Sequence, residues 1–311
     1  WRVRESREWT GSGCVPWRGR RRHFFCCCLP SSPSAVPLQS TAYTALVVAS
    51  ALAVYSLLSG TPLLQLPAKL AAIVLIPSHV PTSTRWWLLL LWLAMFVVSV
   101  AFAVAVSSVV GTSNSRLRKF FHLTLSVVYL SGCLVDPWFL ELSCFLLLCI
   151  FILLEQLRCL SVPPWANALN EHLLVFKDEQ DDEWLLTPLF LLGGMSMPLL
   201  LLSPSLPPHL SHFSGLLSVG VGDSAAALVG SLCGKHFWIK EKRKSIEGST
   251  AFFLSCLLCS LVLRPLCSSP SPSFFSLILA SSILSLAEAF LPLFDNLLLP
   301  ILAFFLFNFL P

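Results

Sequence analysis

Charged residues are scarce in this chain of 311 residues, at 12% of the sequence against 56% for hydrophobic residues. Soluble domains carry about a quarter charged residues, so a soluble globular fold is not expected. The net charge is only +4, and seven of the 20 basic residues lie within residues 1–40. This balance does not indicate a nucleic-acid partner, and no pattern in the sequence indicates a particular protein partner.

Two further absences exclude other classes of protein. Residues 1–40 lack the continuous apolar core and small-residue cleavage site of a signal peptide, and we interpret them as a disordered leader or the edge of an incomplete gene model. The pair Cys256 and Cys259 has zinc-like spacing, but no second pair or histidine couple accompanies it. Cysteines within apolar segments behave as small hydrophobes, so neither a zinc site nor a disulfide framework is expected.

What the chain has in abundance is long apolar runs. Runs of about 17 to 25 residues are long enough to span roughly 30 Å of hydrocarbon as helices. The sequence predicts an all-α, multi-pass transmembrane helical bundle with about eight to ten spans. The predicted helices cover residues 41–59, 62–77, 86–110, 120–135, 138–157, 185–203, 213–233, 250–267, 274–291 and 295–310.

Basic residues alternate between the predicted loops. Arg116, Arg118 and Lys119 precede the fourth span, whereas the turn near Asp136 contains no Lys or Arg. Further basic residues follow the fifth and seventh spans, and the turns 203–212 and 268–273 again have none. Because basic loops stay on the cytosolic side, these loops are expected to face the cytosol.

The most polar stretch of the apolar region begins with Gly220, Gly222 and Asp223. Asp223 lies about ten residues from either end of its span, near mid-membrane in a straight helix. The glycines predict a broken helix whose backbone lines a polar cavity, and ionisable groups at that depth are functional candidates. The stretch has no βαβ context for a dinucleotide fingerprint and no complete P-loop. A glycine-assisted kink, with Asp223 in a structural salt bridge, remains the alternative.

A basic loop follows at residues 235–244, and two interpretations of it remain open. The cations either enforce topology and touch anionic lipid, or bind a triphosphate together with the turn that follows. In that turn Lys244 supplies a point charge and hydroxyls supply donors, while Glu247 is a candidate metal ligand or base. Helix capping is the alternative for Ser245 and Glu247.

Several motifs resemble, in order, those of the dolichol kinases and their CTP-dependent polyprenol kinase relatives. The resemblance covers roughly residues 111–311, with Ser249 where Thr is usual. The motifs are RKFFH at 118–122, FILLEQLR at 151–158, KDEQD at 177–181, LLGGMSMP at 191–198, GVGDSAA at 220–226, KSIEGS at 244–249, Glu288, and DNLLLP at 295–300. The resemblance implies amino-terminal transmembrane helices at 41–110 and a catalytic transmembrane domain at 111–311.

The resemblance implies an endoplasmic-reticulum enzyme, with its site facing the cytosol, that phosphorylates dolichol with CTP for protein N-glycosylation. We hypothesise that Asp223 and Glu247 hold a divalent cation such as Mg²⁺. We also expect Asp223 and Lys119 to act in catalysis, with His122 or Glu155 as the base. The residues expected to bind the nucleotide are Gly220, Gly222, Gly230, Ser231, Gly234, Lys235, Lys240, Lys242, Arg243, Lys244, Ser245, Glu247, Gly248 and Ser249.

Two competing functions remain open from the sequence. One is another CTP-using lipid enzyme, such as a phytol kinase or a phosphatidate cytidylyltransferase, which needs similar phosphate and metal groups. The other is a non-enzymatic transporter in which Asp223 serves as an ion relay.

Overall fold

The computed structural model describes most of the chain from residue 60 onward. The described ranges are 60–75, 80–110, 115–159, 184–238, 244–268, 272–291 and 294–310, with isolated positions elsewhere between 45 and 270. The leader 1–40 lies outside the described residues, and so does the expected span 41–59 apart from isolated positions.

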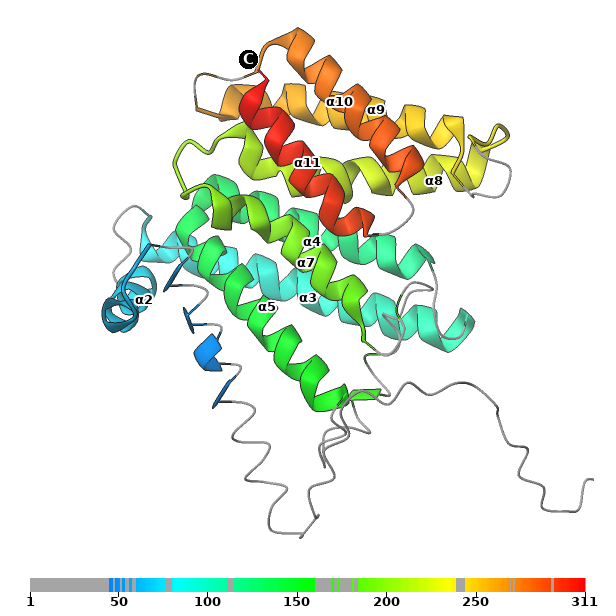
Figure 1. The fold of residues 1–311 in the computed structure, drawn as a ribbon. Helices are drawn as coiled ribbons and strands as arrows, with labels where there is room; N and C mark the ends of the chain where they lie inside the picture. The colour runs from blue at the N-terminus through cyan, green and yellow to red at the C-terminus, as the bar shows by residue number, and fades with distance from the viewer. Residues whose placement is uncertain are drawn as a thin grey trace, which may run out of the picture.

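The described part folds as a bundle of helices (Figure 1). Most predicted spans correspond to one helix each, with ends shifted by a few residues. In chain order the elements are η1 (Leu63–Gln65), α2 (Leu66–Leu75), α3 (Thr82–Val110), α4 (Ser115–Val135), α5 (Pro137–Cys159), α7 (Leu186–Leu201), η3 (Leu210–Phe213), η4 (Leu216–Asp223), α8 (Ser224–Cys233), α9 (Ile246–Leu263), η5 (Arg264–Leu266), α10 (Phe274–Phe290) and α11 (Asp295–Phe309).

The length and apolar composition of the described helices confirm the predicted fold class, an all-α bundle of apolar helices. Four described helices are long and apolar enough to cross a membrane, namely Thr82–Phe102, Pro137–Cys159, Leu216–Cys233 and Ile246–Leu266. Four shorter apolar helices are Lys119–Val135, Leu186–Leu201, Phe274–Phe290 and Asp295–Phe309. The span predicted at 62–77 is different: α2 has ten residues, or about 15 Å at 1.5 Å per residue, roughly half of the hydrocarbon thickness.

The segment η4 is the centre of the bundle. It contacts α4, α7, α9, α10 and α11, and seven of its eight residues are buried. Its winding is π-helical, and it continues directly into α8. The predicted break at Gly220 and Gly222 is therefore wrong, because the helix changes its winding there without interruption. Such π-helical turns occur frequently at functional sites.

One end of the described bundle gathers several charged side chains that pair with one another, and we call it the charged end. It is the end where α4, α9 and α11 begin and where α8 and α10 finish, at the right of Figure 1. At the opposite end, Arg85 Nε donates to Asp136 Oδ2 at 2.5 Å and forms a buried ion pair with it. Asp136 Oδ1 also accepts from the backbone N–H of Phe139 at 3.1 Å, so this pair fastens α3 to the start of α5.

Candidate active site

Asp223 is the buried centre of the first charged group. Its Oδ2 forms an ion pair with Lys119 Nζ and lies 3.5 Å from His122 Nδ1. Lys119 and His122 stand three residues apart on α4, so both side chains leave the helix on one face. The side chains of His122 and Asp223 are 4% and 10% exposed, whereas that of Lys119 is 25% exposed. The sequence placed these three residues together, and the structure brings them into contact.

Lys244 forms the second charged group with the ends of two helices. Its Nζ donates to Glu288 Oε1 at 2.9 Å and to the Glu288 backbone carbonyl at 2.7 Å, and it lies 3.6 Å from Asp295 Oδ2. Glu288 belongs to the last turn of α10 and Asp295 is the first residue of α11. An ammonium has three protons to donate, and all three have acceptors nearby within the protein.

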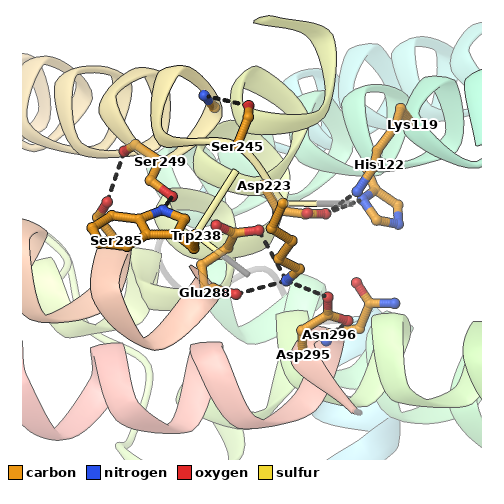
Figure 2. A network of polar contacts seen from close by, with 12 residues as sticks. Lys119, His122, Asp223, Trp238, Ser245, Ser249, Ser285, Glu288, Asp295 and Asn296 are labelled. Atoms are coloured by element: carbon orange, nitrogen blue, oxygen red, sulfur yellow. Dashed lines mark hydrogen bonds and ion pairs between the residues drawn. The ribbon is translucent and has the colours of Figure 1, made fainter. Parts of the chain in front are cut away.

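The two groups lie close together at the charged end, as Figure 2 shows for Asp223, Glu288 and Asp295. Three carboxylates there face two ammonium groups. Burial alone would lower the pKa of Lys244, but the nearby carboxylates of Glu288, Asp295 and Asp223 outweigh burial and raise that pKa. Lys244 therefore stays protonated at neutral pH and can stabilise negative charge at this end of the bundle.

The polar residues of the turn that begins α9 form hydrogen bonds within that turn and with the loop between α8 and α9. Ser245 is the N-cap, and its Oγ accepts from the backbone N–H of Gly248 at 3.1 Å, so the capping interpretation holds for this serine. Glu247, in the first turn of the same helix, contacts the loop before it. Its carboxylate pairs with His236 Nδ1 at 2.8 Å and accepts from the His236 backbone N–H at 3.3 Å. Ser249 Oγ accepts from the indole N–H of Trp238 at 2.9 Å.

The remaining predicted nucleotide-binding polar residues differ in their positions. Ser231 is exposed, and its Oγ donates to the Leu228 carbonyl of its own helix at 2.8 Å. Lys235 is exposed in the loop after α8. Lys240, Lys242 and Arg243 lie outside the described residues.

The glycines predicted to approach phosphates lie where other parts of the chain pack closely against them. A Cβ added at Gly220 would lie 2.1 Å from Ser126 Oγ, and one at Gly222 would lie 2.8 Å from the Phe252 ring. A Cβ at Gly234 would lie 2.3 Å from the Gly230 carbonyl. Gly230 and Gly248 face each other where α8 meets α9, because a Cβ at Gly248 would lie 3.5 Å from Gly230 Cα. Close packing accounts for these positions, and binding of phosphate by their N–H groups stays a prediction.

Glu155 belongs to a different group of charges. Its carboxylate accepts from Arg158 Nη2 at 2.6 Å and Nε at 2.8 Å, and from the backbone N–H of Leu185 at 2.7 Å. These bonds join the end of α5 to the residue before α7 and occupy both carboxylate oxygens. The contacts give Glu155 a structural role, and its action as a base stays a prediction.

A divalent cation fits the charged end only if a bound molecule that carries phosphates supplies further metal ligands. Within the described ranges, no three His, Cys, Asp or Glu side chains are grouped as a ready metal site. Mg²⁺ often binds through one or two carboxylates plus substrate phosphates, and Asp223 can supply one carboxylate of that kind. The contacts of Glu247 are with His236, so the predicted pairing of Glu247 with Asp223 on one metal finds no support.

Three residues that were not among the predicted site residues belong to this end. Glu288 and Asp295 pair with Lys244, and Trp238 bonds to Ser249. The signal for the two acids was available, because each flanks the turn between the last two spans and ionisable residues at span ends are uncommon. Trp238 gave no such signal, since one aromatic residue in a basic loop has no distinctive pattern.

Curated proteins from a plant, a mammal and a fission yeast are similar to this chain of apolar helices. The chain is 31% identical over 222 residues to "Dolichol kinase EVAN" of Arabidopsis thaliana, covering 70% of this chain and 39% of that protein. It is 31% identical over 238 residues to the human "Dolichol kinase", covering 71% and 44%. It is 31% identical over 195 residues to "Dolichol kinase sec59" of Schizosaccharomyces pombe, covering 61% and 38%. No family model and no solved structure matches the chain.

These three curated relatives share one name, that of the dolichol kinases. The matched part of the chain is homologous to the dolichol kinases. The chain spans less than half the length of these curated relatives.

Proposed function

We propose that this protein phosphorylates dolichol, with CTP as the phosphoryl donor, at the cytosolic face of the endoplasmic-reticulum membrane. The product would be the lipid carrier for protein N-glycosylation. The names of the relatives support the kinase activity and the substrate. The observation that carries the proposal is the charged end itself, where Lys119, Asp223, Lys244 and Glu288 form partly buried ion pairs at one end of a bundle of apolar helices.

The donor and the orientation rest on further arguments. CTP is supported by the resemblance of residues 244–249 to the family motif. The cytosolic face is supported by basic residues, since Lys119 and Lys244 both lie at the charged end and basic loops remain in the cytosol. An apolar substrate suits a bundle whose helices expose large hydrophobic side chains, such as Leu254, Leu258 and Val262 along α9.

The proposed reaction is an in-line phosphoryl transfer. The dolichol oxygen forms a bond to the γ-phosphorus, the bond from that phosphorus to the β,γ-bridging oxygen breaks, and CDP leaves. The hydroxyl proton passes to a base, and we assign this role to His122, whose imidazole lies beside Asp223 at the charged end. Asp223, 3.5 Å from His122 Nδ1, orients the ring and stabilises its protonated form.

Positive side chains stabilise the charge that develops on the phosphates. Lys119 is the more available lysine, because its ammonium is paired with one carboxylate whereas that of Lys244 lies beside two. Bound Mg²⁺ would neutralise further phosphate charge, with Asp223 as its protein ligand. In phosphoryl transfer the protein contributes mainly positioning and electrostatic stabilisation, and the described ion pairs supply fixed charges of both signs for this purpose.

Label transfer in membranes that contain the protein tests the proposal. Wild-type membranes should transfer label from γ-labelled CTP to dolichol, and Asp223→Asn should reduce the rate at least 100-fold. Asp136→Asn is the matched control, since it removes another buried, ion-paired carboxylate at the opposite end and should retain the wild-type KM for CTP.

Other outcomes identify the competing functions. Label on phytol but not on dolichol would indicate a phytol kinase, and a cytidylyl product would indicate a cytidylyltransferase. Ion flux that depends on Asp223 but needs no nucleotide would indicate a transporter. Wild-type transfer by Asp223→Asn would contradict the assigned site.

A further inference from the structure

Backbone hydrogen bonds close the two ends of the loop between α8 and α9. Trp238 N–H donates to the Lys244 carbonyl at 3.3 Å, and Ile246 N–H donates to the His236 carbonyl at 2.8 Å. Between them Phe237 and Ser245 form an isolated antiparallel bridge. The backbone on which Lys244 stands is therefore paired directly with residues 236–238.

The Trp238 side chain connects this paired backbone to two helices. Its indole N–H donates to Ser249 Oγ at 2.9 Å, and its ring centroid lies 5.5 Å from that of Phe290 on α10. Ser249 continues the connection, because its backbone carbonyl accepts from Ser285 Oγ at 2.7 Å. Figure 2 shows Trp238, Ser249 and Ser285 linked in this order. The indole thus joins the loop to α9 and, through Ser249, to α10.

The connection reaches the same part of α10 that Lys244 contacts. Ser285 and Glu288 are three residues apart, so they lie on one face of the helix. Lys244 bonds to Glu288 while the backbone carbonyl of Lys244 bonds to Trp238. Trp238 and Lys244 are therefore held to one helix face by two attachments, one through the indole and one through the Lys244 ammonium.

We propose that Trp238 is a positioning residue. It holds the Lys244 ammonium against Glu288 and so fixes the position of one positive charge of the nucleotide site. The inference rests on the proposed function, since the nucleotide is the ligand whose binding it affects. Trp238 acts through Lys244 and needs no contact with the nucleotide. Its hydrogen-bond donor is essential to this role, because the ring contact with Phe290 alone does not fix the distance to Ser249.

Steady-state kinetics of Trp238→Phe provides the first test. This change keeps an aromatic ring and removes the N–H donor. The KM for CTP should rise about three- to ten-fold, the factor expected from one lost hydrogen bond, while kcat and the KM for dolichol stay within two-fold. Trp87→Phe, at an exposed position on α3, is the matched control and should leave all three constants unchanged.

Variants of Ser249 test the proposed partner. Ser249→Ala removes the acceptor and should raise the KM for CTP as much as Trp238→Phe does. Ser249→Thr retains the hydroxyl and should raise the KM for CTP less than Ser249→Ala does. The double variant Trp238→Phe/Ser249→Ala should be no worse than either single variant, because both remove one shared bond. Fully additive effects would overturn the pairing.

Limited proteolysis gives a readout that does not depend on activity. Trypsin cleavage after Lys244 releases a fragment that begins at Ser245, which mass spectrometry identifies. Its rate should rise at least three-fold in Trp238→Phe and in Ser249→Ala, and should be unchanged in Trp87→Phe. A wild-type cleavage rate, or a wild-type KM for CTP, in Trp238→Phe would overturn the inference. Faster cleavage with no kinase activity in the wild-type protein would instead refute the proposed function and leave the anchoring of Lys244 supported.

Discussion

Removing the Asp223 carboxylate should cost stability as well as activity. In Asp223→Asn the Lys119 ammonium loses its ion-pair partner, and breaking a buried pair from one side costs about 3–5 kcal/mol. The Lys119 side chain is 25% exposed and gains some hydration, so we expect a smaller loss, of about 2–3 kcal/mol. Lys119→Met should cost a similar amount, because it leaves Asp223 charged and buried.

The double variant Asp223→Asn/Lys119→Met separates stability from activity. With both charges gone, no desolvated ion remains, so at least half of the lost unfolding free energy should return. Activity should not return, because both groups are proposed to act on the nucleotide. The measurements are denaturant unfolding of the purified protein in detergent and label transfer from γ-labelled CTP. A double variant as unstable as the sum of the two single variants would show that the ion pair does not couple these residues.

Three further changes test the packing around the site. Arg85→Met should lower the unfolding free energy by about 2–3 kcal/mol, because it leaves Asp136 buried without this partner, and should leave the KM for CTP unchanged; a raised KM would contradict a purely structural role. Gly220→Ala should cost about 1–3 kcal/mol by overpacking against Ser126, and Ser126→Ala should restore most of the loss in the double variant, whereas no recovery would refute the contact. Ser245→Ala should cost about 1 kcal/mol through the lost cap, and retained stability in thermal unfolding would show that the cap contributes nothing.

Much of the fold was predictable from the sequence, because a bilayer requires long apolar helices and the ends of those helices are marked by Pro, Ser and basic residues. The meeting of Lys119, His122 and Asp223 was also predictable in outline. Buried charges need partners, and few charges exist in these helices to provide them.

Other features depend on how the helices pack, which no local pattern specifies. Lys244 was expected to face a phosphate, which stays a prediction, and the turn between α10 and α11 also brings Glu288 and Asp295 to its ammonium. Gly220 was expected to break its helix, but it admits Ser126 of α4. Glu155 was a candidate base, and its bond to the Leu185 backbone follows from the approach of α5 to α7.

The central claim is that the groups around Asp223 and Lys244 form one nucleotide site. Equilibrium binding of CTP with Mg²⁺ to the purified protein, in the absence of dolichol, tests it most directly. Lys119→Met and Lys244→Met should each weaken binding at least ten-fold, and Asp136→Asn should bind like the wild type. Wild-type affinity in either lysine variant would contradict the claim.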